Sequence, residues 1–240
     1  MKPQELSKFI TQTIPAQIPV LIKGAPGIGK TDIVSKACKD VGARLLVSHP
    51  VVDEPIDYKG LPAITDKHAE FLPFGALRAL IEADRPTVYF MDDLGQAPPT
   101  VQAAAMQLIL ARRINGSRVS DHVTFIAATN RKQDKAGVSG ILEPVKSRFV
   151  SIVELEPDIE DWAAWAASNN LPPEVIAFIR FRPQLLFDFA PSVGMNNTPC
   201  PRTVHNVGKL MQLGLTPELE FEAYAGAAGE GFAAELTGFL

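Results

Sequence analysis

Short apolar runs recur along the chain, separated by longer segments in which apolar residues repeat every three or four positions. The runs are rich in β-branched or aromatic residues and predict five strands, at residues 19–24, 43–49, 87–92, 123–129 and 148–155. The intervening segments, such as 30–42 and 99–113, have the spacing of helices. Nearly continuous apolar strands that alternate with helices are typical of a mostly parallel sheet covered on both faces. The fold class we expect is therefore α/β.

Two parts of the chain depart from this alternation. The segment 53–75 is rich in Pro, Gly and charge but keeps alternating apolar positions, and we interpret it as a β-hairpin insertion. Beyond Pro157 only helical spacing remains. The sequence thus predicts a main α/β domain over residues 1–157 and a small helical domain over residues 158–240.

Composition narrows the class of protein further. A chain of 240 residues with 46% hydrophobic content can form one sizeable core and a smaller appendage. We expect a cytoplasmic protein without a membrane span, because no apolar run approaches about 18 residues and no signal peptide is evident at the start. Cys38 and Cys200 have no zinc-ligand spacing around them. The net charge of −4, without a block of like charges, leaves nucleic-acid binding open but unsupported.

The strongest motif is GAPGIGKT, which fits the phosphate-binding pattern GxxxxGK[ST] and lies between a predicted strand and a predicted helix. Glycines allow the backbone N–H groups to turn toward a phosphate, and the helix that follows adds its positive end. Lys30 is placed to reach the β- and γ-phosphates of ATP, and the Thr31 hydroxyl to bind Mg²⁺. An ordinary glycine-rich turn is the alternative. The candidate nucleotide-binding residues are Gly24, Ala25, Pro26, Gly27, Ile28, Gly29, Lys30 and Thr31.

Two adjacent carboxylates, Asp92 and Asp93, follow the third predicted strand. A carboxylate at the end of a buried strand is costly unless it meets a cation or a hydrogen-bond donor, so the pair indicates a site. Asp92 is placed to hold Mg²⁺, as an acid at this position does in P-loop nucleotidases. Asp93 then orients or polarises the attacking water. The alternative for Asp93 is a turn cap or a solvent-facing residue.

The fourth predicted strand ends in Asn130, a further polar residue at the edge where open α/β sheets bind ligands. Asn130 is placed to hydrogen-bond the γ-phosphate or the attacking water. Alone, an asparagine after a strand is more often a turn residue. After the two motifs above, the catalytic interpretation is favoured.

Five segments together resemble the motifs of AAA+ ATPases, over about residues 18–213. The resemblance is carried, in order, by GAPGIGKT (Walker A), YFMDDLGQAPPTVQAAAMQLILARR (Walker B), FIAATN (sensor 1), EPVKSRF (arginine finger) and CPRTVHN (sensor 2). The Gly-x-Ala-Pro-Pro-x-x-Gln stretch after the acids and the insertion ahead of them are similar to the MoxR family. Asp93 stands where that family usually has Glu, and Leu94-Gly95-Gln96 replaces the commoner Ile-Asn-Arg.

The resemblance assigns two arginines. Arg148 resembles the arginine finger that reaches the γ-phosphate in the neighbouring subunit, a role for which the planar, charge-spreading guanidinium is suited. Arg202 resembles the sensor 2 arginine, which contacts the nucleotide from the lid. The alternatives are a surface arginine at a helix end for Arg148 and an ordinary first-turn residue after Pro201 for Arg202.

The resemblance implies a P-loop αβα domain followed by a helical lid, and an ATPase that uses ATP and Mg²⁺. A finger acting in trans requires an assembly, and we expect a homo-hexameric ring. The MoxR family implies chaperone-like remodelling of a protein client, often with a partner that carries a von Willebrand factor A domain. Two other classes stay open: a slow-hydrolysing, nucleotide-gated binding module, and a DNA-processing motor of replication or phage type. A metabolic kinase is disfavoured because no acceptor-substrate motif is evident.

Overall fold

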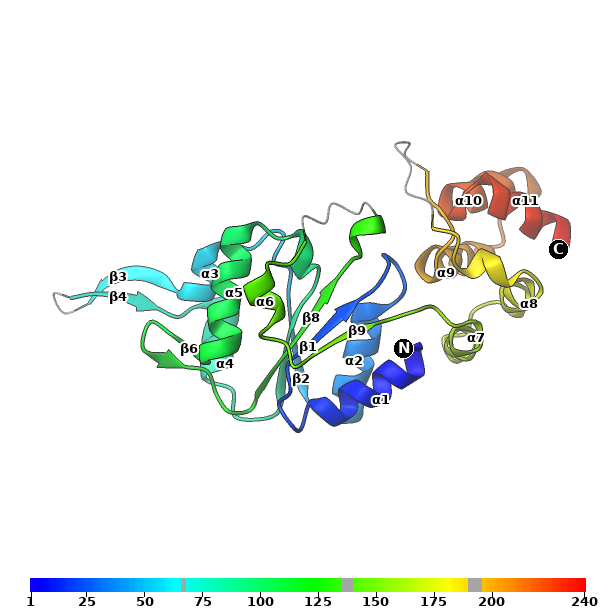
Figure 1. Ribbon diagram of the computed structural model, residues 1–240. Helices are drawn as coiled ribbons and strands as arrows, with labels where there is room; N and C mark the ends of the chain where they lie inside the picture. Colours follow the sequence, from blue (N-terminus) through cyan, green and yellow to red (C-terminus); the bar gives the residue numbers. More distant parts are fainter. Residues whose placement is uncertain (66–67, 135–139, 190–195) are drawn as a thin grey trace.

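The computed structural model describes residues 1–65, 68–134, 140–189 and 196–240, and its centre is a five-stranded sheet (Figure 1). All neighbouring strands in this sheet are parallel, and their order is β2-β5-β8-β1-β9. The fold class expected from the sequence is confirmed. The strands are β1 (Val20–Lys23), β2 (Arg44–Ser48), β5 (Thr87–Met91), β8 (Val123–Thr129) and β9 (Ser151–Glu154).

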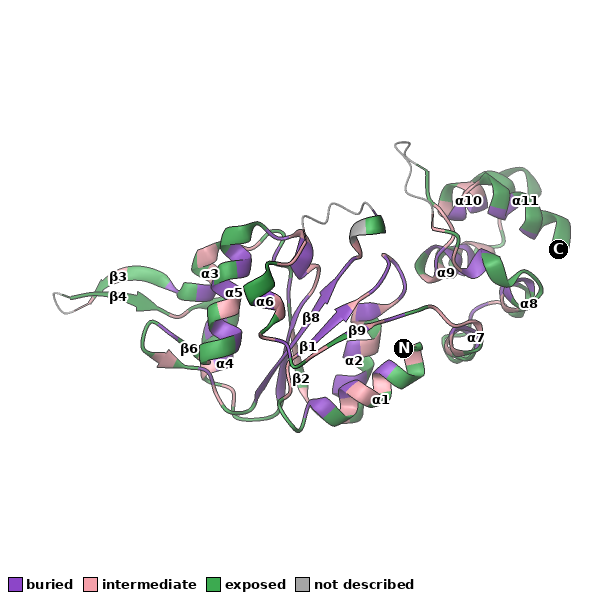
Figure 2. Cartoon of the chain, viewed as in Figure 1, coloured by how far each residue is buried: buried purple, intermediate pink, exposed green. Residues whose placement is uncertain are grey.

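Helices cover both faces of the sheet because its central strands are apolar on both faces. Every residue of β5 and β8 is buried (Figure 2). Along β5, Val88 and Phe90 pack with α1 and α2, whereas Tyr89 and Met91 pack with α4 and α5. The alternation follows from the two-residue period of a strand. These helices are α1 (Pro3–Thr13), α2 (Lys30–Asp40), α4 (Gly75–Ile81) and α5 (Pro99–Ala111).

The segment 53–75 contains a short helix as well as a hairpin. Helix α3 (Pro55–Lys59) comes first, and its N-cap residue Glu54 donates from its backbone N to Asp57 Oδ2 at 2.8 Å. The antiparallel strands β3 (Leu61–Thr65) and β4 (His68–Leu72) follow and project from the body of the molecule (Figure 1). The sequence analysis missed α3, because five residues are too few to show a helical period. A second small ribbon joins β6 (Arg113–Ile114) to β7 (Ser117–Arg118).

After β9 the described part of the chain contains helices and loops but no strand. Its core is separate from the two cores that cover the sheet faces and contains Trp162, Phe178, Val204 and Phe232. The rings of Phe178 and Phe232 pack edge to face, with their centroids 5.3 Å apart. No helix in the described ranges is long and apolar enough to cross a membrane. The helices are α7 (Ile159–Ser168), α8 (Pro173–Phe181), α9 (Pro201–Met211), α10 (Pro217–Ala228) and α11 (Glu230–Phe239).

The first residues of the chain hold the connection between β9 and α7. The Met1 carbonyl accepts a hydrogen bond from Glu156 N at 3.0 Å. Lys2 Nζ lies 2.7 Å from Asp158 Oδ2, and Gln4 N donates to Asp161 Oδ2 at 2.8 Å. Because Gln4 is in the first turn of α1, the positive ends of α1 and α7 both face these carboxylates. The contacts fasten α1 to the start of the helical region.

Replacing Asp158 with alanine is expected to lower the free energy of unfolding by about 1 kcal/mol at pH 7. Asp158 is the N-cap of α7 and accepts from Asp161 N at 3.0 Å, whereas its ion pair adds little because Lys2 is exposed. Lys2 and then the capped N–H of Asp161 lower the pKa of Asp158, so this stability is present above the pKa of the unfolded state and is lost as pH falls through the folded one. Urea unfolding at pH 7 and pH 3 measures it. The exposed Asp84→Ala is the control, and an equal loss in both variants at pH 7 contradicts the assignment.

Candidate active site at the carboxyl edge of the sheet

The glycine-rich loop 24–29 connects β1 to α2 and is shaped by two left-handed glycines. Gly27 has φ +72° and Gly29, the N-cap of α2, has φ +93°. An added Cβ at Gly29 would meet nothing within 4 Å, so the backbone conformation and not crowding by the chain favours glycine there. At Gly27 an added Cβ would lie 2.5 Å from Cys200 Sγ. The open space at the start of α2 is the kind of site that binds an anionic group.

Lys30 is buried at the start of α2, with only 7% of its surface exposed. Its ammonium donates to the carbonyls of Gly24 at 3.0 Å and Ala25 at 2.9 Å, and to Asn130 Oδ1 at 2.6 Å. Burial lowers the pKa of Lys30 to about 8, although the carboxylates of Asp93 and Asp92 act in the opposite direction. The lysine is thus still largely charged at pH 7 and is held by its own loop and by the end of β8.

Thr31 and Asp92 bring two oxygen atoms together beside Lys30. Thr31 Oγ1 donates to Asp92 Oδ2 at 2.6 Å, and Asp92 Oδ1 accepts from Asp93 N at 3.1 Å. Mg²⁺ prefers oxygen ligands and usually takes only one or two from the protein, the rest coming from water and phosphate. The hydroxyl and carboxylate fit that preference. No group of three or more His, Cys, Asp or Glu side chains within the described ranges could hold a metal ion by itself.

Asp93 is held in place by the residue that also contacts Lys30. Asn130 Nδ2 donates to Asp93 Oδ1 at 3.0 Å, so Asn130 joins the lysine to the carboxylate. Asp93 has φ +57° and precedes the 3-10 turn η1 (Leu94–Gln96). Burial, and then the neighbouring Asp92, raise the pKa of Asp93. A raised pKa makes this carboxylate a stronger base than an exposed aspartate.

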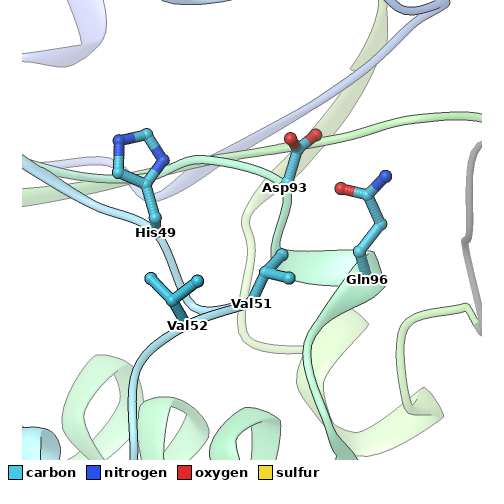
Figure 3. A pocket seen from close by; sticks show the side chains of 5 residues that line it. All are labelled: His49, Val51, Val52, Asp93 and Gln96. Atoms are coloured by element: carbon cyan, nitrogen blue, oxygen red, sulfur yellow. The ribbon is translucent and has the colours of Figure 1, made fainter.

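A pocket of about 530 Å³ opens beside Asp93. Figure 3 shows the imidazole of His49 and the side chains of Asp93 and Gln96 around it, with Val51 and Val52 completing the wall. Sequence reasoning gave His49 no chemical role. Its position directly after β2, the strand beside β5, was the available signal, because parallel neighbours end at the same edge.

Helix α9 begins directly on the glycine-rich loop. Arg202 N donates to the Gly27 carbonyl at 3.0 Å, and the buried Cys200 thiol packs against Gly27. The positive charge of Arg202 adds to the lowering of the Lys30 pKa and acts against the raising of the Asp93 pKa. The helical region therefore meets the loop through backbone and thiol contacts, while the exposed Arg202 guanidinium, to which the sequence pointed, makes no hydrogen bond or ion pair with the described residues.

Arg148 belongs to a later segment of the chain, between β8 and β9. It follows the one-turn helix α6 (Glu143–Lys146), and its Nη1 donates to Ser147 Oγ at 3.4 Å. Its buried Nε has no hydrogen-bond partner among the described residues. No hydrogen bond or ion pair within the described ranges connects the Arg148 side chain to Lys30 or Asp93.

Comparisons with known proteins identify the family of the chain. Residues 20–157 match the model of the ATPase family associated with various cellular activities, AAA. The chain belongs to the AAA family. A comparison with curated proteins finds no significant match. Among solved structures, this AAA chain resembles a point mutant of Thermotoga maritima RuvB at 17% identity and TM-score 0.57, with 99% of this chain and 68% of RuvB covered.

A second group of similar structures is NtrX from Brucella abortus. The complex with ATP has 14% identity and TM-score 0.58, with 96% of this chain and 53% of NtrX covered. The complex with ADP has 16% identity and TM-score 0.57, with 96% and 54% covered. At such identities the likeness to both proteins shows the fold of this AAA chain.

In this AAA chain the fold gathers most of the residues that the sequence analysis selected. Lys30, Thr31, Asp92, Asp93 and Asn130 form one connected group at the carboxyl edge of the sheet. Their roles toward a nucleotide stay predictions.

Proposed function

We propose that this chain is a MoxR-like AAA+ ATPase that binds and hydrolyses ATP with Mg²⁺ in a homo-hexameric ring and remodels a protein client. One observation carries the hydrolytic part of the proposal: a buried cation, an amide and a carboxylate are connected in series beside a hydroxyl–carboxylate pair, at the open end of α2. The family match supports the ATPase assignment. The MoxR assignment, the ring and the client rest on the motifs in the sequence.

Each residue has a distinct task in this proposal. The backbone N–H groups of the loop bind the phosphates, and Lys30 exchanges its contact with Asn130 for phosphate oxygens. That exchange leaves Asn130 and Asp93 free to orient the attacking water, and Asp93 accepts its proton. Thr31 and Asp92 would hold Mg²⁺, which supplies positive charge to the phosphate oxygens when bound. Arg202 holds the lid over the nucleotide.

Two remaining features, Arg148 and the hairpin β3–β4, are assigned to ring formation and to client binding. Arg148 does not reach the site of its own chain through any hydrogen bond or ion pair of the described residues, which suits a guanidinium offered to the neighbouring subunit. The hairpin β3–β4 exposes apolar side chains, Ile64 the most at 83%, and we assign it the contact with the client. The MoxR resemblance adds a partner with a von Willebrand factor A domain.

A second function is favoured by Asp93 itself. Aspartate is one methylene shorter than the glutamate usual in this position, and Asn130 binds it. A displacement of about 1 Å can cost on the order of 100-fold in rate, so the chain could serve as a nucleotide-gated module that binds ATP and turns over slowly. The DNA-motor alternative has a structural relative in Thermotoga maritima RuvB, which is described as a Holliday junction branch migration motor.

Measuring ATP turnover per subunit in the native chain, Asp93→Asn and Asp93→Glu tests the proposed function. We expect native turnover that rises with protein concentration, a loss of about 100-fold in Asp93→Asn, and little gain in Asp93→Glu. Tight ATP binding with negligible native turnover, restored at least tenfold by Asp93→Glu, would establish the gated module instead. Turnover that depends on added duplex DNA, with salt-sensitive DNA binding, would establish the DNA motor.

A further inference from the structure

The helix that precedes Arg148 is too short to hold its own direction. Helix α6 has four residues, and an isolated single turn is unstable in water. Two buried side chains, Val145 and Phe149, anchor its far end in the core between α5 and the sheet. Residues 140–142 lead into its first residue, and a polar side chain of α5 is hydrogen-bonded to this segment.

That side chain is Gln102, which is 1% exposed. Its Oε1 accepts a hydrogen bond from Leu142 N, the N-cap residue of α6, at 3.0 Å. Its Nε2 donates to the carbonyls of Gly140 and Ala97, each at 3.0 Å. One amide therefore satisfies three buried or half-buried backbone groups, which few side chains other than Gln or Asn can do.

The Ala97 carbonyl connects the same amide to the hydrolytic acid. Ala97 ends the turn η1 that starts directly after Asp93. Within this turn, Gly95 lies so close to β8 that an added Cβ would be 2.2 Å from Thr129 Oγ1, and the Gly95 carbonyl accepts from Gly140 N at 3.2 Å. The turn after Asp93, the end of β8 and the approach to α6 are consequently packed and hydrogen-bonded as one unit, with Gln102 at its centre.

We infer that Gln102 is a positioning residue. It connects the turn that follows Asp93 to the segment before Arg148, the arginine that this chain offers to the next subunit. The inference rests on the proposed function, because it assumes that Arg148 acts in trans. Through Gln102, a change at Asp93 moves the start of α6 and tilts this short helix about its anchored end, which redirects Arg148 in the same subunit. Hydrolysis at one site is thereby coupled to the finger at the next.

The first test compares Gln102→Met with Gln107→Met, the same substitution at an exposed position of the same helix. Methionine fills a similar volume but donates and accepts none of the three hydrogen bonds. We expect kcat for ATP to fall about 10- to 100-fold in Gln102→Met, with the ATP dissociation constant within about twofold of native. Gln107→Met should match the native chain. A Gln102→Met protein with native kcat, or one that loses ATP affinity in proportion to kcat, would overturn the inference.

The second test assigns the defect to one side of the subunit interface. Lys30→Ala subunits lack a working site but have a finger, and Arg148→Ala subunits have a site but no finger. Mixed in equal amounts, the two are expected to recover roughly a quarter of native turnover, because that share of interfaces pairs an intact site with an intact finger. Adding Gln102→Met to the Lys30→Ala subunit should then lower the recovered turnover at least tenfold.

The outcomes separate the two levels of the proposal. If the parent mixture recovers nothing, shared sites and the coupling built on them both fail. If the parent mixture recovers turnover that Gln102→Met in the Lys30→Ala subunit leaves unchanged, the trans finger stands and the role of Gln102 is wrong. Gln107→Met in that same subunit is the matched control and should leave the recovery intact.

Discussion

Replacing Arg148 with alanine is expected to lower kcat for ATP hydrolysis about a thousandfold, while the ATP dissociation constant stays within about twofold of native. The reason is electrostatic: a guanidinium stabilises the charge that develops on the phosphate oxygens in the transition state more than it stabilises bound ATP. The side chain is also poorly satisfied where it lies, with a buried Nε lacking a partner among the described residues. Within the described ranges, its exposed end donates only to Ser147 Oγ, at 3.4 Å, and is the part that can meet an incoming phosphate.

Steady-state turnover and equilibrium ATP binding measure this effect, with Arg180→Ala as the control. Arg180 is an exposed arginine that pairs with Glu160 in the helical region. Titrating Arg148→Ala into native protein adds a test of coordination, since turnover that falls more steeply than the native fraction indicates that subunits hydrolyse in concert. Native kcat in the pure Arg148→Ala protein would rule out the finger.

Replacing Lys30 with methionine is expected to weaken ATP binding at least about 100-fold, because a buried charge-assisted contact to phosphate is lost. The free energy of unfolding without nucleotide should change far less. Burying the ammonium costs free energy, as its pKa of about 8 indicates. Lys30→Met removes this cost, which offsets the loss of the hydrogen bonds to Gly24 and Ala25. Isothermal titration with ATP and urea unfolding of the free protein measure the two effects.

The pH dependence of unfolding checks the same lysine. The pKa of Lys30 is lower in the folded than in the unfolded protein, so the unfolded state binds more protons between about pH 8 and the ordinary lysine value of 10.5. The free energy of unfolding therefore increases as the pH rises through this range. Lys30→Met should lack this gain. Lys36→Met, an exposed position on the same helix, should retain both the gain and the ATP affinity. An ATP affinity in Lys30→Met within tenfold of native would contradict the phosphate role.

Much of the fold and part of the site could be predicted from the sequence, because the signals were local. The five strands followed from apolar runs, and the loop before α2 from a glycine motif whose backbone angles depend on the residues themselves. Asp92, Asp93 and Asn130 each follow the end of a strand, and parallel strands end at one edge. To predict that these three residues lie at the same edge therefore required only the prediction that the sheet is parallel.

Only the tertiary structure decided which of these groups touch. Lys30 meets Asn130, a hundred residues away, because β8 lies directly beside β1 in the sheet, and strand order is not encoded in any local pattern. The three partners of Gln102 come from turns whose approach depends on packing, so its place in the stretch after the acids did not reveal them. The backbone contact of Arg202 with Gly27 likewise depends on how two regions dock.

The sequence by itself determined the chemical groups and the edge at which they lie, because strand ends and glycine turns are local properties. The three-dimensional packing decided their partners, because hydrogen bonds between distant segments depend on strand order and loop closure.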